Sequence, residues 1–375
     1  MKIVHIITGL RDGGAEKTLY KICRYDNQNE HSVISLQKGG KYFPLLKNLG
    51  VKVYCVNMSF FSIFKIFNII NLLRFLKPDL VQTWLVHGDF IGSIAARLSG
   101  IKNIVWNVRY SNFELGKTKL ITIVLIKTLA KLSFFIPKLI VVVSKSAKKT
   151  CNELGYYKKK LRLITNGYNL LTLKPNRYHK PYIKKKFKIK NKIPLIGTVA
   201  RFDPKKDHVN LLKALSVVKA KNIDFFCVLV GSGMNKFNKK LVSEISKLGL
   251  TNYVKLLDTT HNIPRTMNDL DIHIQSSSYG EGFPNVVAEA MACGTPCVVT
   301  NVGDAAYIVG KTGWVVPPKN SIKLAKAIEI AISEVKTVNW KKRCNQARLR
   351  IKKNFDIKKM IKSFNKIWVS VLTKN

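Results

Sequence analysis

Short apolar runs alternate with helix-like patterns along most of the chain. The run "KIVHIIT" near the N-terminus is typical of a buried strand, and a helix is expected through "LYKICRY". Further strands are expected at "HSVISL", "VKVYCV", "LVQTW", "NIVWNV" and "LIVVVS", with helical stretches between several of them. Continuous apolar strands separated by helices are typical of parallel βαβ units. The pattern therefore predicts an α/β protein built on parallel sheets.

The alternation is interrupted once, which predicts a domain boundary. The stretch "KPNRYHKPYIKKKFKIKNK" is polar and basic, and the α/β pattern starts again at "PLIGTVA". A chain of 375 residues also exceeds the ~250–300 residues at which single cores stop growing. We predict an N-terminal domain over residues 1–178, a C-terminal domain over residues 179–355, and a helix over residues 356–375 that crosses back. Two such domains would face each other across a cleft, with strand ends from both pointing into it.

The net charge narrows the class of partner. Lys and Arg total 65 against 21 Asp and Glu, which gives a formal charge of +44. Such a field attracts nucleic acid, anionic lipid or nucleotide-linked substrates. Alternatively, the lysine excess reflects coding bias, since the chain is also rich in Ile and Asn. Without a zinc-spaced Cys/His set, an aromatic RNA-binding signature or a continuous basic helix, nucleic acid is not an expected partner.

The cysteines and the N-terminus favour the cytosol. The seven cysteines contain no C-x-x-C pair, so neither a zinc site nor a disulfide framework is predicted. "MKIVHIITGL" turns to glycine and charge too soon for a signal peptide. No window offers the ~20 uninterrupted apolar residues that span a bilayer.

The segment "SSSYGEGFPNVVAEAMACGTPCVV" carries the strongest candidate chemistry. Pro284 suits the first position of a helix and Gly294 suits its C-terminal cap. The helix start at Phe283–Val286 is then an anion site whose dipole favours phosphate. Glu281 and Glu289 suit hydroxyl groups rather than phosphate, so the pair predicts a sugar site beside a phosphate site. The alternative is that Glu281 only favours the helix N-terminus and Glu289 is a surface residue.

Three other turns that follow strands are candidate phosphate sites. "ARFDPKKDH" places Arg201 and Lys206 after a strand, where they could neutralise a diphosphate or simply form a solvated basic loop. "LVGSG" contains Gly231 and Gly233, which allow close approach of backbone N–H groups. "GLRDGGAEKT" places Gly14 before a helix, although without the full G-x-G-x-x-G spacing.

Together these segments resemble the family-4 retaining glycosyltransferases, whose fold is GT-B. "EGFPNVVAEAMACGTPCVVTNVGD" resembles their E-x7-E segment and "ARFDPKKDH" their Arg-x4-Lys clamp. "LVGSG", "LITNGYN" and "GLRDGGAEK" resemble further turns of the family, in the family's order and over nearly the whole chain. The resemblance implies two doubly wound, Rossmann-like domains and a hexosyltransferase that uses a nucleotide diphosphate sugar, UDP by family frequency.

The resemblance also implies roles for these residues. Arg201 and Lys206 would neutralise the donor diphosphate, and Gly14, Gly231 and Gly233 would lie near the donor. Glu281 would contact the transferred sugar and Glu289 the ribose. Backbone N–H groups in the segment Phe283–Val286, which includes Pro284 and Asn285, would hold phosphate.

The implied mechanism needs no cofactor and no metal. The resemblance implies that the Arg/Lys pair supplies the positive charge in place of a metal. Retaining glycosidases use two carboxylates ~5 Å apart, one as a nucleophile. The family instead implies front-face attack, with the departing diphosphate activating the acceptor hydroxyl, so that positioning and charge stabilisation dominate catalysis.

One departure concerns the acceptor side. Many members of the family carry a histidine after a strand of the N-terminal domain, where "NIVWNVRYSN" offers Arg109. Arg109 would take that place and bind an anionic group, or contribute to acceptor recognition. His87 in "QTWLVHGDF" is a second acceptor-side candidate, although a lone histidine is more often structural.

The segment "SFFSIFKIFNIINLLRFLKPD" bears on the acceptor and on localisation. Its polar residues recur every third position, so at ~3.6 residues per turn they wind around a helix. Either a well-buried helix or one partly sunk in a bilayer interface has this pattern, with burial slightly favoured. With the basic excess, this makes an anionic membrane surface a partner and a lipid-linked, lipopolysaccharide or capsule glycan an acceptor. The expected location is the inner face of the cytoplasmic membrane.

Two other functions are compatible with the sequence. Nucleotide-sugar 2-epimerases share the GT-B architecture but lack this E-x7-E arrangement and need no acceptor. A non-enzymatic, basic membrane-surface protein is the other reading, and it predicts no function for Glu281 or Glu289.

Overall fold

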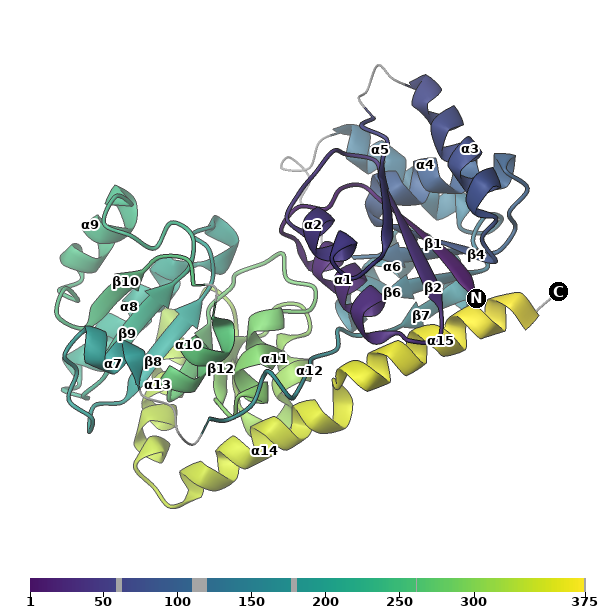
Figure 1. Cartoon of the computed structure of the whole chain (residues 1–375). Coiled ribbons are helices and arrows are strands. Elements are labelled where there is room, and N and C mark those ends of the chain that lie inside the picture. Colours follow the sequence, from purple (N-terminus) through teal and green to yellow (C-terminus); the bar gives the residue numbers. More distant parts are fainter. Residues whose placement is uncertain (59–62, 110–119, 177–180, 261, 374–375) are drawn as a thin grey trace. The chain divides into compact units, whose positions relative to one another are not determined.

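The computed structural model divides the chain into two compact units. Unit 1 comprises Met1–Gly167 and Ile357–Asn375, and unit 2 comprises Tyr168–Asp356. The structure describes residues 1–58, 63–109, 120–176, 181–260 and 262–373 (Figure 1). Each unit has its own parallel sheet and its own apolar core, and each is described separately below.

Unit 1 is built on a seven-stranded parallel sheet in the order β3-β2-β1-β4-β5-β6-β7. Its strands are β1 (Lys2–Ile7), β2 (Glu30–Ser35), β3 (Lys52–Cys55), β4 (Leu80–Trp84), β5 (Ile104–Val108), β6 (Leu139–Val142) and β7 (Leu161–Leu163). Its helices are α1 (Gly14–Tyr25), α2 (Tyr42–Lys47), α3 (Ile66–Leu76), α4 (Leu85–Leu98), α5 (Leu120–Leu132), α6 (Lys145–Glu153) and α15 (Ile357–Thr373), with 3-10 turns at Ile63–Lys65 and Lys158–Lys160.

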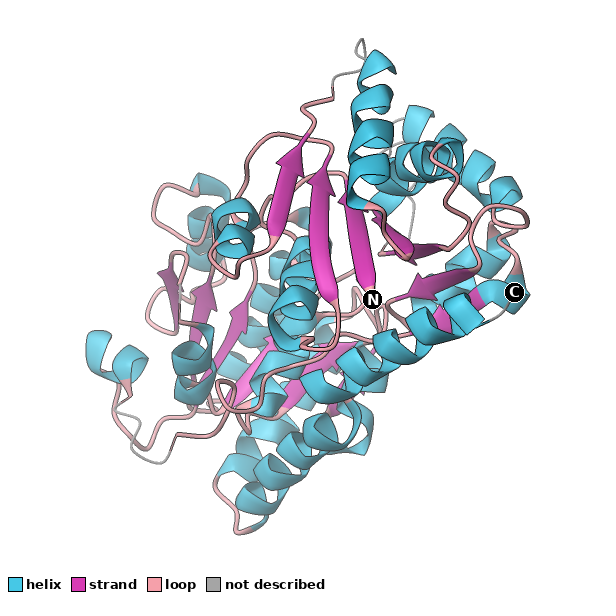
Figure 2. Ribbon diagram, turned by 45° about the vertical axis from the view of Figure 1, so that its right-hand side comes forward, coloured by secondary structure: helices cyan, strands magenta, loops and turns pink. Residues whose placement is uncertain are grey.

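The strand order determines which helices share a face of this sheet. The chain moves outward from β1 to β3, then returns to β4 and continues to β7. Because parallel crossovers are right-handed, the two directions place their helices on opposite faces. Helix α4 packs against both α3 and α5 on one face, and α1 packs against α2 and α15 on the other. Figure 2 shows helices on both sides of the strands.

The C-terminal helix α15 completes the core of unit 1. Its buried face includes Phe364 and Trp368, which belong to the same apolar cluster as Ile7 and Trp84 of the sheet. The indole N–H of Trp368 donates a hydrogen bond to Oε1 of Gln82 on β4 (2.6 Å). Residues far apart in the sequence therefore build one core.

Unit 2 is built on a six-stranded parallel sheet in the order β10-β9-β8-β11-β12-β13. Its strands are β8 (Leu195–Val199), β9 (Phe226–Val230), β10 (Val254–Leu257), β11 (Ile272–Gln275), β12 (Cys297–Thr300) and β13 (Trp314–Val316). Its helices are α7 (Tyr182–Lys186), α8 (His208–Ala220), α9 (Lys239–Lys247), α10 (Ile263–Asp269), α11 (Asn285–Ala292), α12 (Ala305–Val309), α13 (Ser321–Val335) and α14 (Asn339–Asn354), with 3-10 turns at Pro204–Lys206 and Gly310–Thr312. Strands β8, β9, β11 and β12 are buried along their whole length, as expected for a parallel sheet covered on both faces.

The units divide earlier than the predicted boundary at residues 178 and 179. The division falls between Gly167 and Tyr168. The ring of Tyr168 is fully buried, its hydroxyl donates to Oδ1 of Asn285 (2.6 Å), and its N–H donates to the carbonyl of Phe355 (2.9 Å). The basic stretch after it contains helix α7, whose first N–H groups bond to Asp269 of unit 2. Composition did not reveal these buried contacts.

Candidate active site

The loops that follow β8 and β11 meet at the centre of the unit 2 sheet. These strands are neighbours, although the chain passes outward through β9 and β10 before it returns to β11. Such a reversal in strand order leaves space for a ligand at the carboxyl ends of the strands. The two loops carry Arg201, Lys206 and Glu281, so the structure brings three predicted site residues to one edge of the sheet.

Asp203 shapes the turn that carries Arg201. Its Oδ1 accepts a hydrogen bond from the N–H of Lys205 (3.0 Å), and its Oδ2 accepts two from the Arg201 guanidinium (3.0 and 2.9 Å). Burial would raise the pKa of Asp203, but the Lys205 N–H and the Arg201 charge outweigh burial, so the pKa is lowered. The Arg201 side chain is 68% exposed, so its guanidinium remains accessible to a ligand.

Lys206 and Glu281 form an ion pair across the two loops. The Lys206 Nζ lies 2.5 Å from Oε1 of Glu281, and the two side chains are 24% and 11% exposed. The Ser277 hydroxyl donates to the same carboxylate oxygen (2.7 Å). Because a carboxylate offers about four acceptor positions, Glu281 can also accept hydrogen bonds from hydroxyl groups of a ligand. The pair places a cation and a hydroxyl acceptor side by side.

Hydrogen bonds hold the two loops in register. The N–H of Ser278 donates to the carbonyl of Lys205 (2.8 Å), and the Ser276 hydroxyl donates to the carbonyl of Lys206 (2.8 Å). Sequence reasoning did not assign roles to these serines. The signal was present, since three serines directly follow the buried strand "IHIQ".

Gly231 and Gly233 position the Arg201 turn from the neighbouring strand. Gly231 has φ +142°, and a Cβ there would lie 2.3 Å from the carbonyl oxygen of Ala200. Gly233 has φ +80°, and a Cβ there would lie 3.0 Å from Cβ of Phe202. The N–H of Phe202 donates to the carbonyl of Ser232 (2.8 Å). The glycines are therefore required for two turns to approach each other, while a contact to the donor stays a prediction.

Helix α11 begins beside Glu281. Pro284 is its N-cap rather than its first residue, and Asn285 begins the helix, because the Pro284 ψ of 99° is extended. The first N–H groups of a helix have no partner within it, so this end favours an anion. Phe283 is buried edge-on against Phe355, with ring centroids 5.4 Å apart, which anchors the segment. Val286 is partly exposed in the first turn.

Glu289 lies one turn inside α11 and is only 5% exposed, so it is not the surface residue of the alternative interpretation. A buried carboxylate in a helix that carries no other acid indicates a specific role.

Gly303 supports the Glu281 loop and was not predicted. It has φ +60°, and a Cβ there would lie 2.4 Å from the Glu281 carbonyl oxygen. The N–H of Asp304 donates to the carbonyl of Gly282 (2.9 Å). The "NVGD" turn after β12 thus packs directly on the backbone of the candidate site.

Two buried histidines near the site are neutral. Burial, together with the smaller effect of the Lys206 charge, lowers the pKa of His208 to about 4 and that of His273 to about 3. The Val199 N–H donates to Nε2 of His273 (3.4 Å), so its proton is assigned to Nδ1. The positive charge of this edge therefore comes from Arg201, Lys205 and Lys206.

In unit 1, Arg109 joins the turn at the start of α1. Its Nη1 donates to Oδ1 of Asn166 (2.6 Å) and to the Thr18 hydroxyl (3.2 Å), and its guanidinium lies 5.3 Å from the Trp84 ring centroid. The Thr18 hydroxyl in turn donates to the carbonyl of Gly14 (2.8 Å). The structure therefore brings the predicted Gly14 and Arg109 together, and adds Asn166 of the "ITNG" turn.

His87 is the third residue of α4, directly after β4, and its side chain is exposed. It lies at the carboxyl edge of the unit 1 sheet, as do Gly14 and Arg109. Its acceptor-side role stays a prediction.

One group of described residues has the composition of a metal site. The ligand atoms of His5, Cys23 and His31 lie within 4.8 Å of one another. The Trp84 N–H donates to Nδ1 of His5 (3.2 Å), so the proton of His5 is on Nε2, which faces Nδ1 of His31 (3.0 Å). Nε2 of His31 then donates to Asp26 (3.0 Å). This hydrogen-bonded chain accounts for the cluster by itself, and burial raises the pKa of the Cys23 thiol, which disfavours the thiolate that a metal needs.

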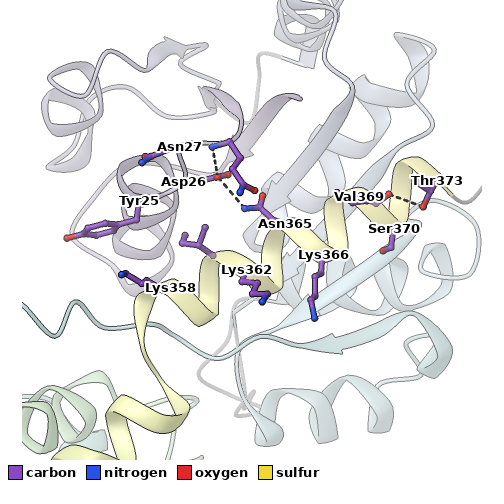
Figure 3. Close-up of a pocket in the computed structure, with 12 residues that line it drawn as sticks. Tyr25, Asp26, Asn27, Lys358, Lys362, Asn365, Lys366, Val369, Ser370 and Thr373 are labelled. Atoms are coloured by element: carbon purple, nitrogen blue, oxygen red, sulfur yellow. Dashed lines mark hydrogen bonds between the residues drawn. The ribbon is translucent and has the colours of Figure 1, made fainter.

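A cavity of about 760 Å³ in unit 1 contains none of the predicted site residues. It opens between the end of α1 and α15, beside Asp26 and Asn365 (Figure 3). The Asp26 carboxylate accepts hydrogen bonds from Asn365 (3.3 Å), Asn29 (2.7 Å) and His31. The cavity is therefore part of the structural network around Asp26 rather than of the candidate site.

Comparison with known proteins identifies the family. The family model described as "Glycosyl transferases group 1" matches residues 179–366, and the model described as "Glycosyltransferase Family 4" matches residues 12–170. The chain belongs to the glycosyl transferases group 1. It is an enzyme of the glycosyltransferase class, and the predicted resemblance is confirmed.

Relatives of this glycosyltransferase include two bacterial proteins that are named as glycosyltransferases. The putative glycosyltransferase EpsF of Bacillus subtilis is 24% identical over 315 residues, which cover 80% of this chain and 79% of EpsF. An Escherichia coli UDP-Gal:alpha-D-GlcNAc-diphosphoundecaprenol alpha-1,3-galactosyltransferase is 25% identical over 307 residues, which cover 79% of this chain and 76% of that enzyme.

Solved structures confirm the fold of this glycosyltransferase. HepE of Anabaena, in complex with UDP, superposes with a TM-score of 0.86 at 22% identity, over 99% of this chain and 100% of HepE. A glycosyltransferase from Rickettsia africae superposes with a TM-score of 0.87 at 22% identity, over 100% of this chain and 99% of that one. The predicted pair of Rossmann-like, GT-B domains is therefore correct.

No helix in the described parts of this glycosyltransferase combines the length and the apolar character that crossing a membrane requires.

Proposed function

We propose that this glycosyltransferase transfers a hexose or an N-acetylhexosamine from a UDP-sugar to a lipid-linked or polysaccharide glycan, with retention of configuration and without a divalent metal. The observation that carries the proposal is the edge of unit 2 where Arg201, Lys206 and Glu281 meet the start of α11. There, two cations and a helix N-terminus can neutralise a diphosphate in place of a metal ion.

The relatives support the donor and acceptor classes. HepE has been crystallised with UDP and with UDP-glucose, and the Escherichia coli relative is named for a UDP-galactose donor and a diphosphoundecaprenol-linked acceptor. A UDP-sugar and a lipid-linked glycan are therefore the substrates that we propose for this chain. Such an acceptor places the enzyme peripherally, at the inner face of the cytoplasmic membrane.

Each group at this edge has a proposed task in catalysis. Arg201 would bind the diphosphate through its planar fork, and Lys206 would leave Glu281 to face the β-phosphate. Glu281 would then accept a hydrogen bond from the transferred sugar. The acceptor oxygen bonds to the anomeric carbon on the face that the diphosphate leaves, and its proton passes to the departing phosphate oxygen. The protein supplies position and charge rather than a nucleophile.

The remaining candidates complete the two substrate sites. Glu289 would bind the ribose, and backbone N–H groups between Phe283 and Val286 would bind phosphate. Gly14 would lie near the leaving group. Arg109 and His87 would serve acceptor recognition, and the fixed hydrogen bonds of Arg109 support a positioned charge there.

Replacement of the clamp tests the proposed chemistry. We expect Lys206→Ala to lower turnover of UDP-sugar by ~10²-fold, because it removes one preorganised charge that faces the leaving group. Lys213→Ala, an exposed lysine on α8, is the matched control and should retain wild-type turnover. Equal turnover in the Lys206 and Lys213 variants would contradict the assignment.

Donor class, metal use and stereochemistry need separate measurements. Thermal shifts with a panel of nucleotide diphosphates in EDTA should show the largest rise with UDP, and Glu289→Ala should reduce it. The anomeric proton coupling of the product, by NMR, should match that of the donor. An inverted product, a UDP shift that EDTA abolishes, or an epimerised UDP-sugar in the absence of acceptor would each overturn the corresponding part of the proposal.

A further inference from the structure

One face of unit 1 exposes large apolar side chains. Among the described residues, Phe237 of unit 2 is the one strongly exposed phenylalanine outside the helices α3 to α5 and their flanks. The others lie, with exposed aliphatic residues, on these helices and in the turns beside them: Phe64, Phe67, Phe75, Leu98, Leu120, Ile121, Val124, Phe134 and Phe135. Scattered apolar residues are normal on a surface, but a shared helical face marks an interaction site.

Helix α3 and the 3-10 turn before it present an aromatic outer face. Phe64, Phe67 and Phe75 are 77%, 59% and 76% exposed. The inner face, Ile69, Ile70 and Leu73, is buried. Of the two interpretations left open by the sequence, the slightly favoured well-buried helix does not fit, since the outward positions combine exposed phenylalanine with the polar residues at 68, 71 and 74.

Helix α5 continues this surface beyond α4. Its outward positions begin with Leu120 and Val124, which are 81% and 60% exposed, and continue with Lys127 and Lys131. On the exposed face of α5, apolar residues in the first turns are followed by lysines. Helices that lie in a membrane interface have this arrangement, and their lysine side chains extend to the lipid headgroups.

The charge of the face matches one kind of partner. Helices α3, α4 and α5 contain a single acidic residue, Asp89, which is buried. The basic residues on and beside these helices are Lys65, Arg74, Lys77, Arg97, Lys102, Lys127, Lys131 and Lys138. An apolar face surrounded by cations and lacking exposed carboxylates on its helices is complementary to anionic lipid headgroups above acyl chains.

The topology places the apolar residues next to the acceptor-side residues. Helices α3 and α5 end close before β4 and β6 begin, so they start at the carboxyl edge of the sheet. Phe64, Phe67, Leu120 and Val124 therefore lie toward the edge that carries Arg109. A lipid-linked acceptor held in a bilayer against this face would have its head group near that edge.

We propose that the outer face of α3 and α5 docks unit 1 on an anionic phospholipid bilayer, with Phe64, Phe67, Phe75, Leu120 and Val124 inserted at the interface. The placement of a lipid-linked acceptor near Arg109 rests on the proposed function, whereas the docking on the bilayer does not. Figure 1 shows α3, α4 and α5 gathered on one side of unit 1.

Vesicle co-sedimentation of the full chain tests the proposal. Wild type should pellet with phosphatidylglycerol-containing vesicles at low salt, and much less with pure phosphatidylcholine vesicles. The variant Phe64→Ser/Phe67→Ser/Phe75→Ser should lose at least tenfold in vesicle affinity. Phe237→Ser is the matched control, because Phe237 is 79% exposed and lies in unit 2, and it should pellet like wild type. Lys127→Glu/Lys131→Glu should weaken binding to the anionic vesicles.

Two further measurements keep the outcomes distinct. The thermal shift with UDP reports folding and the donor site, so the triple variant should keep the wild-type shift while it loses vesicles. Light scattering reports self-association. Wild type that stays in solution with anionic vesicles would overturn the docking, as would a triple variant that still pellets. A wild-type dimer that the triple variant dissociates would assign the face to a second copy instead. Failure of the UDP shift would count against the proposed function alone.

Discussion

At the scale of single residues, the Lys206–Glu281 ion pair is the part of the candidate site on which the proposed function depends most. The two groups are 2.5 Å apart and mostly buried, and Ser277 donates to the same carboxylate. Because the two charged groups already bind each other, a ligand that binds either one must compete with the ion pair. If the proposed function is correct, we expect the affinity for the nucleotide to depend mainly on Lys206 and the rate of transfer mainly on Glu281.

Glu281→Gln should separate these two effects. The amide oxygen can still accept from Ser277, but the charge that competes with phosphate for Lys206 is gone. We expect UDP affinity to stay the same or increase, while turnover falls by ~10²-fold because the hydrogen bond to the sugar weakens. Calorimetric UDP titration and initial rates measure the two quantities. Glu153→Gln, an exposed acid in unit 1, is the control. A matched loss of affinity and turnover would contradict this division.

Asp89, also a single residue, allows the effect of a buried carboxyl group on the pH dependence of stability to be tested. Burial raises its pKa to about 8, against the hydrogen bond that it accepts from Thr83 (2.6 Å). A carboxyl with a raised folded-state pKa stabilises the fold fully below its unfolded-state value near ~3.9. That stability is lost as pH rises toward the folded pKa, by at most ~1.4 kcal/mol per pH unit.

Asp89→Asn removes this titration without a change of shape. We expect the melting temperature of the variant, relative to wild type, to rise steadily between pH 5 and pH 8. The exposed Asp224→Asn should show a constant difference over the same range. Thermal unfolding in a pH series measures both, and a flat difference for Asp89→Asn would show that the carboxyl ionises freely in the fold.

At the scale of elements, glycines determine how the strand-following turns fit together. Gly231→Ala would force a Cβ to within 2.3 Å of the Ala200 carbonyl oxygen at φ +142°. We expect a loss of ~1–3 kcal/mol in unfolding free energy, as for a residue in a strained backbone conformation, and at least tenfold weaker UDP binding because the Arg201 turn must move. Gly249→Ala is matched for positive φ, but its nearest neighbour is the flexible end of Lys219. It should lose stability without losing UDP affinity.

The sequence predicted elements better than their packing. Apolar runs located six strands of the unit 1 sheet and the first strand of the unit 2 sheet, because a parallel strand is buried on both faces and forms a continuous apolar run. The glycine and charge patterns located Arg201, Lys206 and Glu281, which the structure brings to one edge. Ser276, Ser278 and Gly303 were missed because their contacts come from residues more than twenty positions away.

Helix α3 shows the limit of periodicity at this scale. In the sequence, the polar residues of this segment recur every third position, so the pattern alone does not distinguish burial from an interface, although within α3 the polar residues at 68, 71 and 74 all lie on the exposed face. The packing of α4 against α3 determines which face is buried, and it leaves Phe64 and Phe67 exposed. The same limit applies to the boundary at Tyr168, whose buried ring lies outside any apolar run.

At the scale of the whole molecule, the chain order and the structural units do not coincide. The last helix, α15, belongs to unit 1, although the residues before it belong to unit 2. Unit 1 therefore cannot complete its core until the C-terminus has been made. The stability of unit 1 therefore depends on contacts between its N-terminal segment and α15, which are far apart in the sequence. A chain whose domains followed one another without interruption would not need such contacts.

Trp368→Ala should expose this dependence. The indole is fully buried and donates to Gln82 on β4, so its loss should cost unit 1 about 3–5 kcal/mol. Because each unit has its own core, calorimetry of the full chain should show one transition moving down while the transition that UDP stabilises stays in place. Val369→Ala, the exposed neighbour on the same helix, should leave both transitions unchanged. A single transition that moves as a whole in the Trp368 variant would mean that the units unfold together, and that α15 couples the stability of the two units.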